Sequence, residues 1–263
     1  MIRIEGLTKE YVERRKRQSD DGHTECPSCG LHRVLDDINL EIPDGELVCV
    51  LGSSGCGKST FLRILAGFDH PTTGQVLVND QPVTGPSGDN IFVFQHSGLL
   101  PWLTVWENVE LGLRNMDDEE KRRDTVQEYI DMVELNGFEG HQPHELSGGM
   151  RRRAELARAM AVNPHTLMMD EPFTGLDFIT HMKMREEVVN MHTLLGRTML
   201  MVTHFIDDAL IMADRIIMFG GSPSHVKLER KLNAPRPRNL DKDEELSNLR
   251  EELYLMMGVN YAV

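Results

Sequence analysis

Residues 52–60 read GSSGCGKST and match the pattern G-x-x-x-x-G-K-[ST]. The apolar run ELVCVLG at 46–52 predicts a buried strand before this stretch, and STFLRILAGF at 59–68 predicts a helix after it. Glycines accept positive φ and leave room for oxygen atoms, so the backbone N–H groups of such a loop can surround a phosphate. Lys58 would reach the β- and γ-phosphates, and the Ser59 hydroxyl would bind Mg²⁺. The predicted phosphate-binding residues are Gly52, Ser53, Ser54, Gly55, Cys56, Gly57, Lys58, Ser59 and Thr60.

A second stretch, HTLMMDEP at 165–172, is an apolar strand that ends in two carboxylates. Downstream of a phosphate-binding loop, Asp170 is expected to orient Mg²⁺ through water. Glu171 is placed to polarise the attacking water as a general base. An acidic pair after a strand is often only a solvated turn, but its position after the loop favours a nucleotide hydrolase.

Further apolar segments alternate with helical ones along the chain. NIFVFQ at 90–95, TMLMVTH at 198–204 and RIIMFG at 215–220 read as strands separated by helical patterns, which predicts a parallel sheet with helices on its faces. Residues 1–12 and 34–42 alternate apolar and polar positions, as half-buried strands do. The predicted fold class is α/β.

Composition narrows the functional classes. The 263 residues are 40% hydrophobic and 27% charged, enough for one large α/β domain or two small ones. No apolar run of eighteen residues and no secretory signal is visible, so a cytosolic protein is expected. The formal net charge of −14 argues against non-specific nucleic-acid binding, because the phosphate backbone would repel the chain.

The segment ELSGGMRRRAELARAM at 145–160 brings in a known family. LSGG followed by basic residues and an alanine-rich helix resembles the signature sequence of ABC-type ATPases. Tyr11 resembles the aromatic that stacks on adenine, and Gln95 resembles the glutamine that binds Mg²⁺ and reports to the transport subunit. GLD at 175–177 resembles the D-loop, and His204 resembles the switch histidine at the γ-phosphate. These motifs occur in the family's order.

The resemblance implies a P-loop NTPase fold with a parallel core sheet, an antiparallel β-subdomain and a helical signature subdomain. The ATPase domain would span residues 1–220, with the helical subdomain at about 96–163. Residues 221–263 are expected to be a C-terminal surface extension.

The resemblance also implies ATP hydrolysis, with ATP and Mg²⁺ as cofactors. The catalytic residues would be Lys58, Glu171 and His204. The residues that hold Mg²⁺ would be Ser59, Gln95 and Asp170. The signature forms a helix N-terminus with free N–H groups but no lysine of its own. The resemblance implies a head-to-tail homodimer, in which the signature of each copy would close over the nucleotide held by the other. The residues expected there are Ser147, Gly148 and Gly149, and Asp177 of the D-loop is also expected among the nucleotide-binding residues.

FQHSGLLPWLTVWENV at 94–109 resembles the equivalent stretch in ATPases of nitrate, sulfonate and taurine importers, as does LSGGM. The resemblance implies a bacterial importer subunit for a small anion, cytoplasmic and peripheral on the inner face of the cell membrane. An integral membrane permease would dock in a groove near this stretch, and a periplasmic or extracellular binding protein would be an indirect partner. The expected groove residues, which would otherwise be simply core, are Leu99, Leu100, Trp102, Leu103 and Trp106.

Two other functional classes remain as alternatives. A soluble ABC-type mechanoenzyme acting on nucleic acid or ribosomes usually has coiled-coil inserts or two cassettes, whereas this acidic chain has one cassette. A P-loop small-molecule kinase would not explain the LSGGM helix. The transported molecule is not encoded here, because the ATPase does not touch it.

Residues 12–33 form an insert that contains HTECPSCGLH at 23–32. Cys26 and Cys29, with His23 and His32, have a spacing compatible with a zinc site, although a ten-residue wrap would be cramped. A redox-active cysteine pair is a second reading. A loop without special chemistry is the third, and the sequence leaves all three open.

Overall fold

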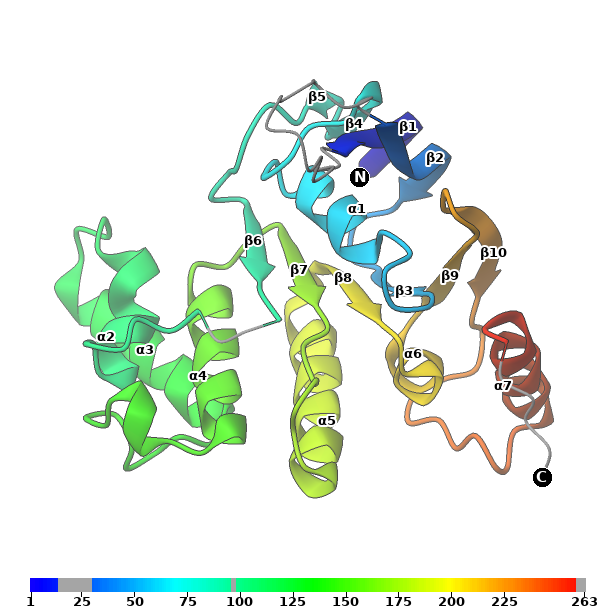
Figure 1. Cartoon of the computed structure of the whole chain (residues 1–263). Coiled ribbons are helices and arrows are strands. Elements are labelled where there is room, and N and C mark those ends of the chain that lie inside the picture. Colours follow the sequence, from blue (N-terminus) through cyan, green and yellow to red (C-terminus); the bar gives the residue numbers. More distant parts are fainter. Residues whose placement is uncertain (14–29, 96–97, 259–263) are drawn as a thin grey trace, which may run out of the picture.

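The structure is a computed structural model, which describes residues 1–13, 30–95 and 98–258. Two sheets and a group of helices make up the fold (Figure 1). Within these described ranges, no helix is long and apolar enough to cross a membrane.

The core sheet has six strands in the order β10-β9-β3-β8-β7-β6. All neighbouring pairs are parallel except β10 with β9, which is antiparallel. Its central strands are buried along their whole length, as expected for a parallel sheet covered on both faces. The strands are β3 (Leu47–Leu51), β6 (Asn90–Val93), β7 (Thr166–Asp170), β8 (Thr198–Thr203), β9 (Arg215–Gly220) and β10 (His225–Lys231).

Two apolar clusters lie on opposite faces of this sheet. Cys49 and Leu51 of β3 face a cluster formed with α4 (Gly148–Ala161), α5 (Phe178–Leu195) and α6 (Ile206–Met212). Val48 and Val50 face the other cluster, which includes α1 (Lys58–Leu65) and the second sheet. Alternate side chains of β3 therefore pack into the two apolar clusters, one on each face of the core sheet.

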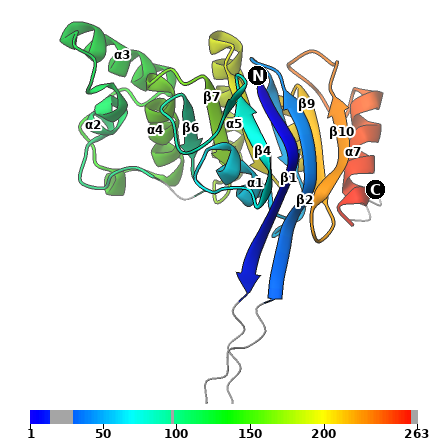
Figure 2. The same ribbon diagram turned by 90° about the horizontal axis from the view of Figure 1, so that it is seen from above.

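The second sheet is antiparallel, with the order β2-β1-β4-β5. Its long strands are paired from Ile2 opposite Ile42 to Glu13 opposite Gly30, and they form a ribbon that projects from the body (Figure 2). The strand pairing thus continues slightly into the expected insert at 12–33. The strands are β1 (Ile2–Glu13), β2 (Gly30–Ile42), β4 (Thr73–Val78) and β5 (Gln81–Pro82).

The helical subdomain lies at one end of the molecule (Figure 1) and contains α2 (Val105–Glu110), α3 (Glu119–Met132) and α4. Each helix begins at a side-chain cap: Thr104 for α2, Asp118 for α3 and Ser147 for α4. Such caps satisfy N–H groups that have no partner within the helix.

Residues after 220, expected as a surface extension, join the core in the structure. β10 pairs with β9, and α7 (Glu244–Met256) buries Leu246, Leu249 and Leu253 in the same cluster as α6. The reason is the spacing of these leucines, which lie on one face of a helix whose other residues are mostly polar.

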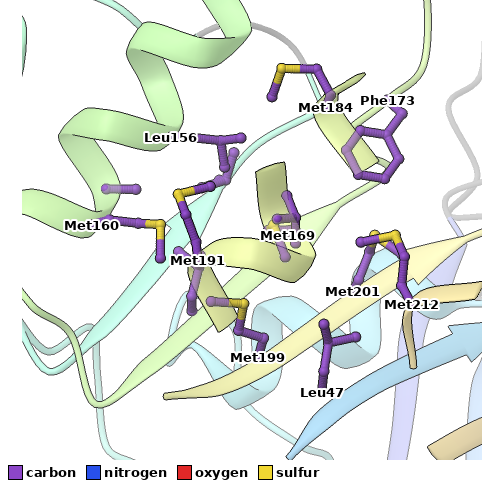
Figure 3. Close-up of a cluster of buried hydrophobic side chains, with 14 of the residues drawn as sticks. Leu47, Leu156, Met160, Met169, Phe173, Met184, Met191, Met199, Met201 and Met212 are labelled. Atoms are coloured by element: carbon purple, nitrogen blue, oxygen red, sulfur yellow. The ribbon is translucent and has the colours of Figure 1, made fainter. Parts of the chain in front are cut away.

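Methionines fill the space between the core sheet and helices α4, α5 and α6 (Figure 3). The thioether chain is flexible and fills irregular gaps, which explains why methionine replaces branched residues on β7 and β8. Phe173, which follows β7, packs in the same cluster. The buried methionines drawn there are Met160, Met169, Met184, Met191, Met199, Met201 and Met212.

Candidate active site

The loop at residues 52–57 connects the carboxyl end of β3 to the N-terminus of α1. Gly57 has φ of 97°, a region that residues with a Cβ rarely adopt. A Cβ at this position would lie 2.8 Å from Val34 Cγ1 and 2.9 Å from Leu35 Cδ2. Backbone conformation and close packing therefore both require glycine here.

Lys58 and Ser59 open α1 and face the site. The Lys58 ammonium is nearly buried and donates to the carbonyls of Gly52 (2.7 Å) and Ser53 (3.0 Å). The Ser59 hydroxyl donates to Asp170 Oδ1 at 2.9 Å, which joins the loop to the end of β7. A hollow of about 430 Å³ lies at this point; it is lined by Val34, Ser54, Gly55, Gly57, Lys58, Ser59, Thr60, Gln95 and Glu171.

The two carboxylates at the end of β7 occupy different environments. Asp170 is only 4% exposed, and burial raises its pKa, although the hydrogen bond from Ser59 acts in the opposite direction. Glu171 has φ of 44°, and its N–H donates to Val202 O at 2.9 Å. A non-glycine residue in this region carries backbone strain, which often marks a functional position.

Three side chains from separate segments surround the Glu171 carboxylate. Gln95 Nε2 donates to Oε2 at 3.4 Å, and the Thr174 hydroxyl donates to the same oxygen at 3.1 Å. His204 Nδ1 lies 3.2 Å from Oε1. The structure thus brings together the glutamine, glutamate and histidine that the sequence analysis places in one site, because β6, β7 and β8 end at the same edge of a parallel sheet.

Tyr11 lies beside this site without lining the hollow. Its ring is 40% exposed, and its hydroxyl donates to Asp69 Oδ2 at 2.7 Å. Lys9 Nζ lies 4.8 Å from the ring centroid and also donates to Asp69. Partial burial and the bond to Asp69 raise the pKa of Tyr11, while hydrogen bonding to Thr60 lowers it. Thr60 therefore links the tyrosine to the phosphate-binding loop.

The signature segment is placed away from the loop, on the opposite face of the core sheet from α1. Ser147 caps α4 by accepting from the N–H of Met150 at 3.2 Å. Ser147 and Gly148 are exposed, whereas Gly149 is buried under Thr180: a Cβ on Gly149 would lie 2.2 Å from Thr180 Cγ2. The signature therefore does not line the hollow at Lys58, and its exposed N-terminus faces outward.

Asp177 is the N-cap of α5 and accepts from the Thr180 N–H at 3.1 Å. Hydrogen bonds from Thr180 hold the pKa of the Asp177 carboxyl below its usual range. The D-loop residue is thus fixed at the start of the helix that covers the signature glycine.

Residues 35–174 match the ABC transporter family, which covers more than half of the 263 residues. This chain belongs to the ABC transporter family. Its parallel core sheet, antiparallel second sheet and helical subdomain have the fold of ABC ATPase cassettes, and the protein is an ATPase.

Relatives of this ABC ATPase include importer subunits. It is 42% identical over 219 residues to a nitrate import ATP-binding protein of Synechocystis sp., covering 83% of this chain and 82% of the relative. It is 40% identical over 219 residues to an aliphatic sulfonates import ATP-binding protein of Bacillus cereus, covering 82% and 86%. A solved dimeric ATP-binding cassette in a post-hydrolysis state, bound to ADP and Pi, superposes with a TM-score of 0.73 at 32% identity, covering 89% of this chain and 100% of that chain.

A group of charged residues on α4 of this ABC ATPase was not found by sequence reasoning. Arg152 is 6% exposed and donates to Phe94 O, Pro172 O and Glu155 Oε2, at 2.7, 2.7 and 2.6 Å. Glu155 Oε1 accepts from Gly98 N at 2.9 Å, and Arg158 donates to Gly98 O at 2.8 Å. The signature helix therefore holds the chain on both sides of Gln95 and directly after Glu171.

The segment after Gln95 combines buried and exposed apolar residues. Leu99 belongs to the core, Trp102 is 68% exposed, and Leu100, Leu103 and Trp106 are half-buried. Leu99 is therefore a core residue, whereas Trp102 is open to solvent.

The loop that carries these residues is organised by a side chain outside the expected set. Asn108 is fully buried; its Nδ2 donates to the carbonyls of Leu100, Leu103 and Thr104, and its Oδ1 accepts from Leu100 N. Its sequence context, a polar residue on an amphipathic helix, does not distinguish it from an exposed asparagine.

His23, Cys26 and Cys29 lie outside the described residues. His32 belongs to β2, where it pairs with Tyr11. Across residues 1–13, 30–95 and 98–258, no group of three or more His, Cys, Asp or Glu residues is arranged to hold a metal ion.

Proposed function

We propose that this protein is the ATP-hydrolysing subunit of a bacterial importer for a small anion, coupled to a separate membrane permease. The names of the nitrate and sulfonate relatives support this cargo class and give no support to a role on nucleic acid or ribosomes. The subunit would work in the cytoplasm, on the inner face of the cell membrane. A periplasmic or extracellular binding protein would deliver the anion to the permease.

The observation that carries the catalytic proposal is the position of the Glu171 carboxylate between Gln95, Thr174 and His204, at the rim of the hollow that Lys58 lines. In this position Glu171 accepts a proton from the attacking water. His204 orients the glutamate and contacts the γ-phosphate. Lys58 neutralises charge on the β- and γ-phosphates.

The residues in and beside the hollow fit ATP and Mg²⁺. The loop at 52–60 offers backbone N–H groups at the start of α1, and Tyr11 offers an exposed ring for adenine beside Thr60. Ser59, Gln95 and Asp170 provide oxygen atoms, the donor type that Mg²⁺ prefers. When bound, Mg²⁺ supplies positive charge that offsets charge developing on the phosphates.

The signature would act on the nucleotide of a second copy. Ser147 and Gly148 expose a helix N-terminus that does not line the hollow at the protein's own Lys58, which supports binding of a phosphate held by another chain. The dimeric state named for the solved relative supports a homodimer. We propose the head-to-tail arrangement, with Asp177 close to the same nucleotide.

The permease would dock on the exposed side of the LLPW segment. Trp102 is the most exposed of the expected groove residues, and Asn108 fixes the loop that presents it. Exposed aromatic side chains on a rigid loop are typical anchors of protein interfaces.

Affinity purification from detergent-solubilised membranes, with the permease co-expressed, tests this function. The wild-type chain should retain an integral membrane protein, and the complex should hydrolyse ATP and take up nitrate or sulfonate when reconstituted in vesicles. Trp102→Ala should lose the permease but keep basal ATPase activity. Phe138→Ala, which alters a partly exposed aromatic elsewhere in the helical subdomain, should retain it. Equal retention by both variants, or ATPase stimulation by DNA or ribosomes instead, would contradict the proposal.

A further inference from the structure

His181 lies in the first turn of α5, four residues after Asp177. Its Nε2 is 2.7 Å from Asp208 Oδ2, and its side chain is 18% exposed. The imidazole contacts two aromatic rings, with centroid distances of 5.2 Å to Phe173 and 5.3 Å to Phe205. The side chain therefore has a defined orientation set by one polar contact and two ring contacts.

These two aromatic residues belong to the segments that carry the catalytic pair. Phe173 follows Glu171 by two residues, and Phe205 follows His204 directly. The rings of His204 and Phe205 are 4.1 Å apart. His181 thus contacts one ring in the segment after each catalytic residue, and His204 Nδ1 itself lies 3.2 Å from Glu171 Oε1.

Asp208, in the first turn of α6, is the polar partner of His181. It is only 3% exposed, and burial raises its pKa, while His181 and Arg185 act in the opposite direction. Arg185 Nη1 lies 3.5 Å from the other carboxylate oxygen. A buried carboxylate requires such partners, so the Asp208 contacts hold His181 in place.

The same turn of α5 also contacts the signature. Thr180, the preceding residue, covers Gly149, and Asp177 caps the turn. The first turn of α5 therefore contacts the signature helix through Thr180 and the segments after Glu171 and His204 through His181.

We infer that His181 is a positioning residue for ATP hydrolysis, which keeps Glu171 and His204 in register through Phe173 and Phe205. This inference rests on the proposed catalytic roles of those two residues. His181 touches neither the phosphate-binding loop nor the hollow, so it acts on the chemical step and not on ATP affinity.

Steady-state kinetics of His181→Ala and His181→Arg test the inference. Loss of the ring should lower kcat by about 10-fold, with the ATP concentration at half-maximal rate unchanged, because a displaced general base affects mainly the transition state. Arginine should restore most of the activity, because a planar guanidinium can pair with Asp208 and stack on both rings.

His192→Ala is the matched control. His192 is a buried histidine on the same helix, but its Nε2 lies 3.0 Å from Gly45 O, away from the hollow. This variant should lower the melting temperature and leave kcat within about 2-fold of the wild type. If His181→Ala does not fold, His181→Gln replaces it, because glutamine keeps a donor for Asp208 and loses the ring contacts.

A kcat for the folded His181 variant within 2-fold of the wild type would overturn the inference, as would an equal fall in kcat for His192→Ala. If the proposed catalytic role of Glu171 is wrong, Glu171→Gln should hydrolyse ATP at a near-normal rate. The two results are read from separate variants and cannot be confused.

Discussion

Replacement of Glu155 by leucine should destabilise the protein strongly, because it leaves the Arg152 guanidinium buried without its carboxylate. Arg152 is 6% exposed and Glu155 1%, and the pair is joined at 2.6 Å. The change also removes the acceptor of the Gly98 N–H.

The expected cost is about 3–5 kcal/mol, the usual result of removing one partner of a buried ion pair. Losing the acceptor of the Gly98 N–H would by itself cost about 1–3 kcal/mol. Because Gly98 and Arg152 share Glu155 as a partner, this cost does not simply add to that of the broken ion pair. The free energy of unfolding of a globular domain is about 5–15 kcal/mol, so Glu155→Leu should clearly lower the urea concentration at the unfolding midpoint.

The double variant Arg152→Met, Glu155→Leu separates stability from catalysis. Removing both charges should recover most of the lost free energy of unfolding. ATPase activity should remain low, because the hydrogen bonds from α4 to Phe94, Gly98 and Pro172 that hold the Gln95 and Glu171 segments are reduced.

Urea unfolding and steady-state ATPase assays measure the two effects. Glu134, which follows α3, forms a more exposed pair with Arg153 of α4, at 3.6 Å, and Glu134→Gln should cost less than about 1 kcal/mol. A Glu155→Leu variant as stable as this control would refute the reasoning, as would a double variant with full kcat.

Three shorter predictions follow from the same structure. Asp170→Asn should cut hydrolysis at least about 100-fold. It should also raise the melting temperature of the nucleotide-free protein at pH 7–8. Burial raises the folded pKa of Asp170, so the wild type loses stability as the pH rises through that pKa. The difference in melting temperature between the variant and the wild type should therefore vanish in acid. Gly57→Ala should abolish binding of a fluorescent ATP analogue, because the strain of about 1–3 kcal/mol and the clash with Val34 distort the loop; unchanged binding would contradict this. Leu253→Ala should cost about 2–5 kcal/mol in urea unfolding, with the exposed Leu255→Ala nearly neutral.

The phosphate-binding loop and the acidic pair were predictable because their chemistry lies in short contiguous patterns. The loop is recognised from its glycines beside Lys58, and Glu171 is recognised from the apolar strand that precedes it. Their meeting also follows from the sequence, since parallel strands end at a common edge. The geometry around Gln95 and His204 is a consequence of the same rule.

The supporting residues were not predictable for a physical reason. Arg152 and Glu155 are charged residues on an amphipathic helix, where the ordinary expectation is a solvated face. Their burial depends on the packing of α4 against the segments at Gln95 and Pro172, which are distant in sequence. His181 is similar, because its contacts come from the segments that follow β7 and β8 and from α6.

The C-terminal region shows a related limit. The strand at 225–231 is mostly exposed and charged, and it pairs only at the edge of the sheet. Composition therefore predicts a surface segment, whereas the backbone pairing and the buried leucines of α7 depend on the core that precedes them.

The most direct test of the account is the behaviour of Glu171→Gln with ATP, measured by light scattering and single-turnover hydrolysis. The variant should bind ATP, form a stable dimer and hydrolyse about 10²–10⁴-fold more slowly than the wild type, as expected for loss of a general base. Near-normal hydrolysis would remove Glu171 from its role, and a variant that stays monomeric with ATP bound would contradict the head-to-tail site.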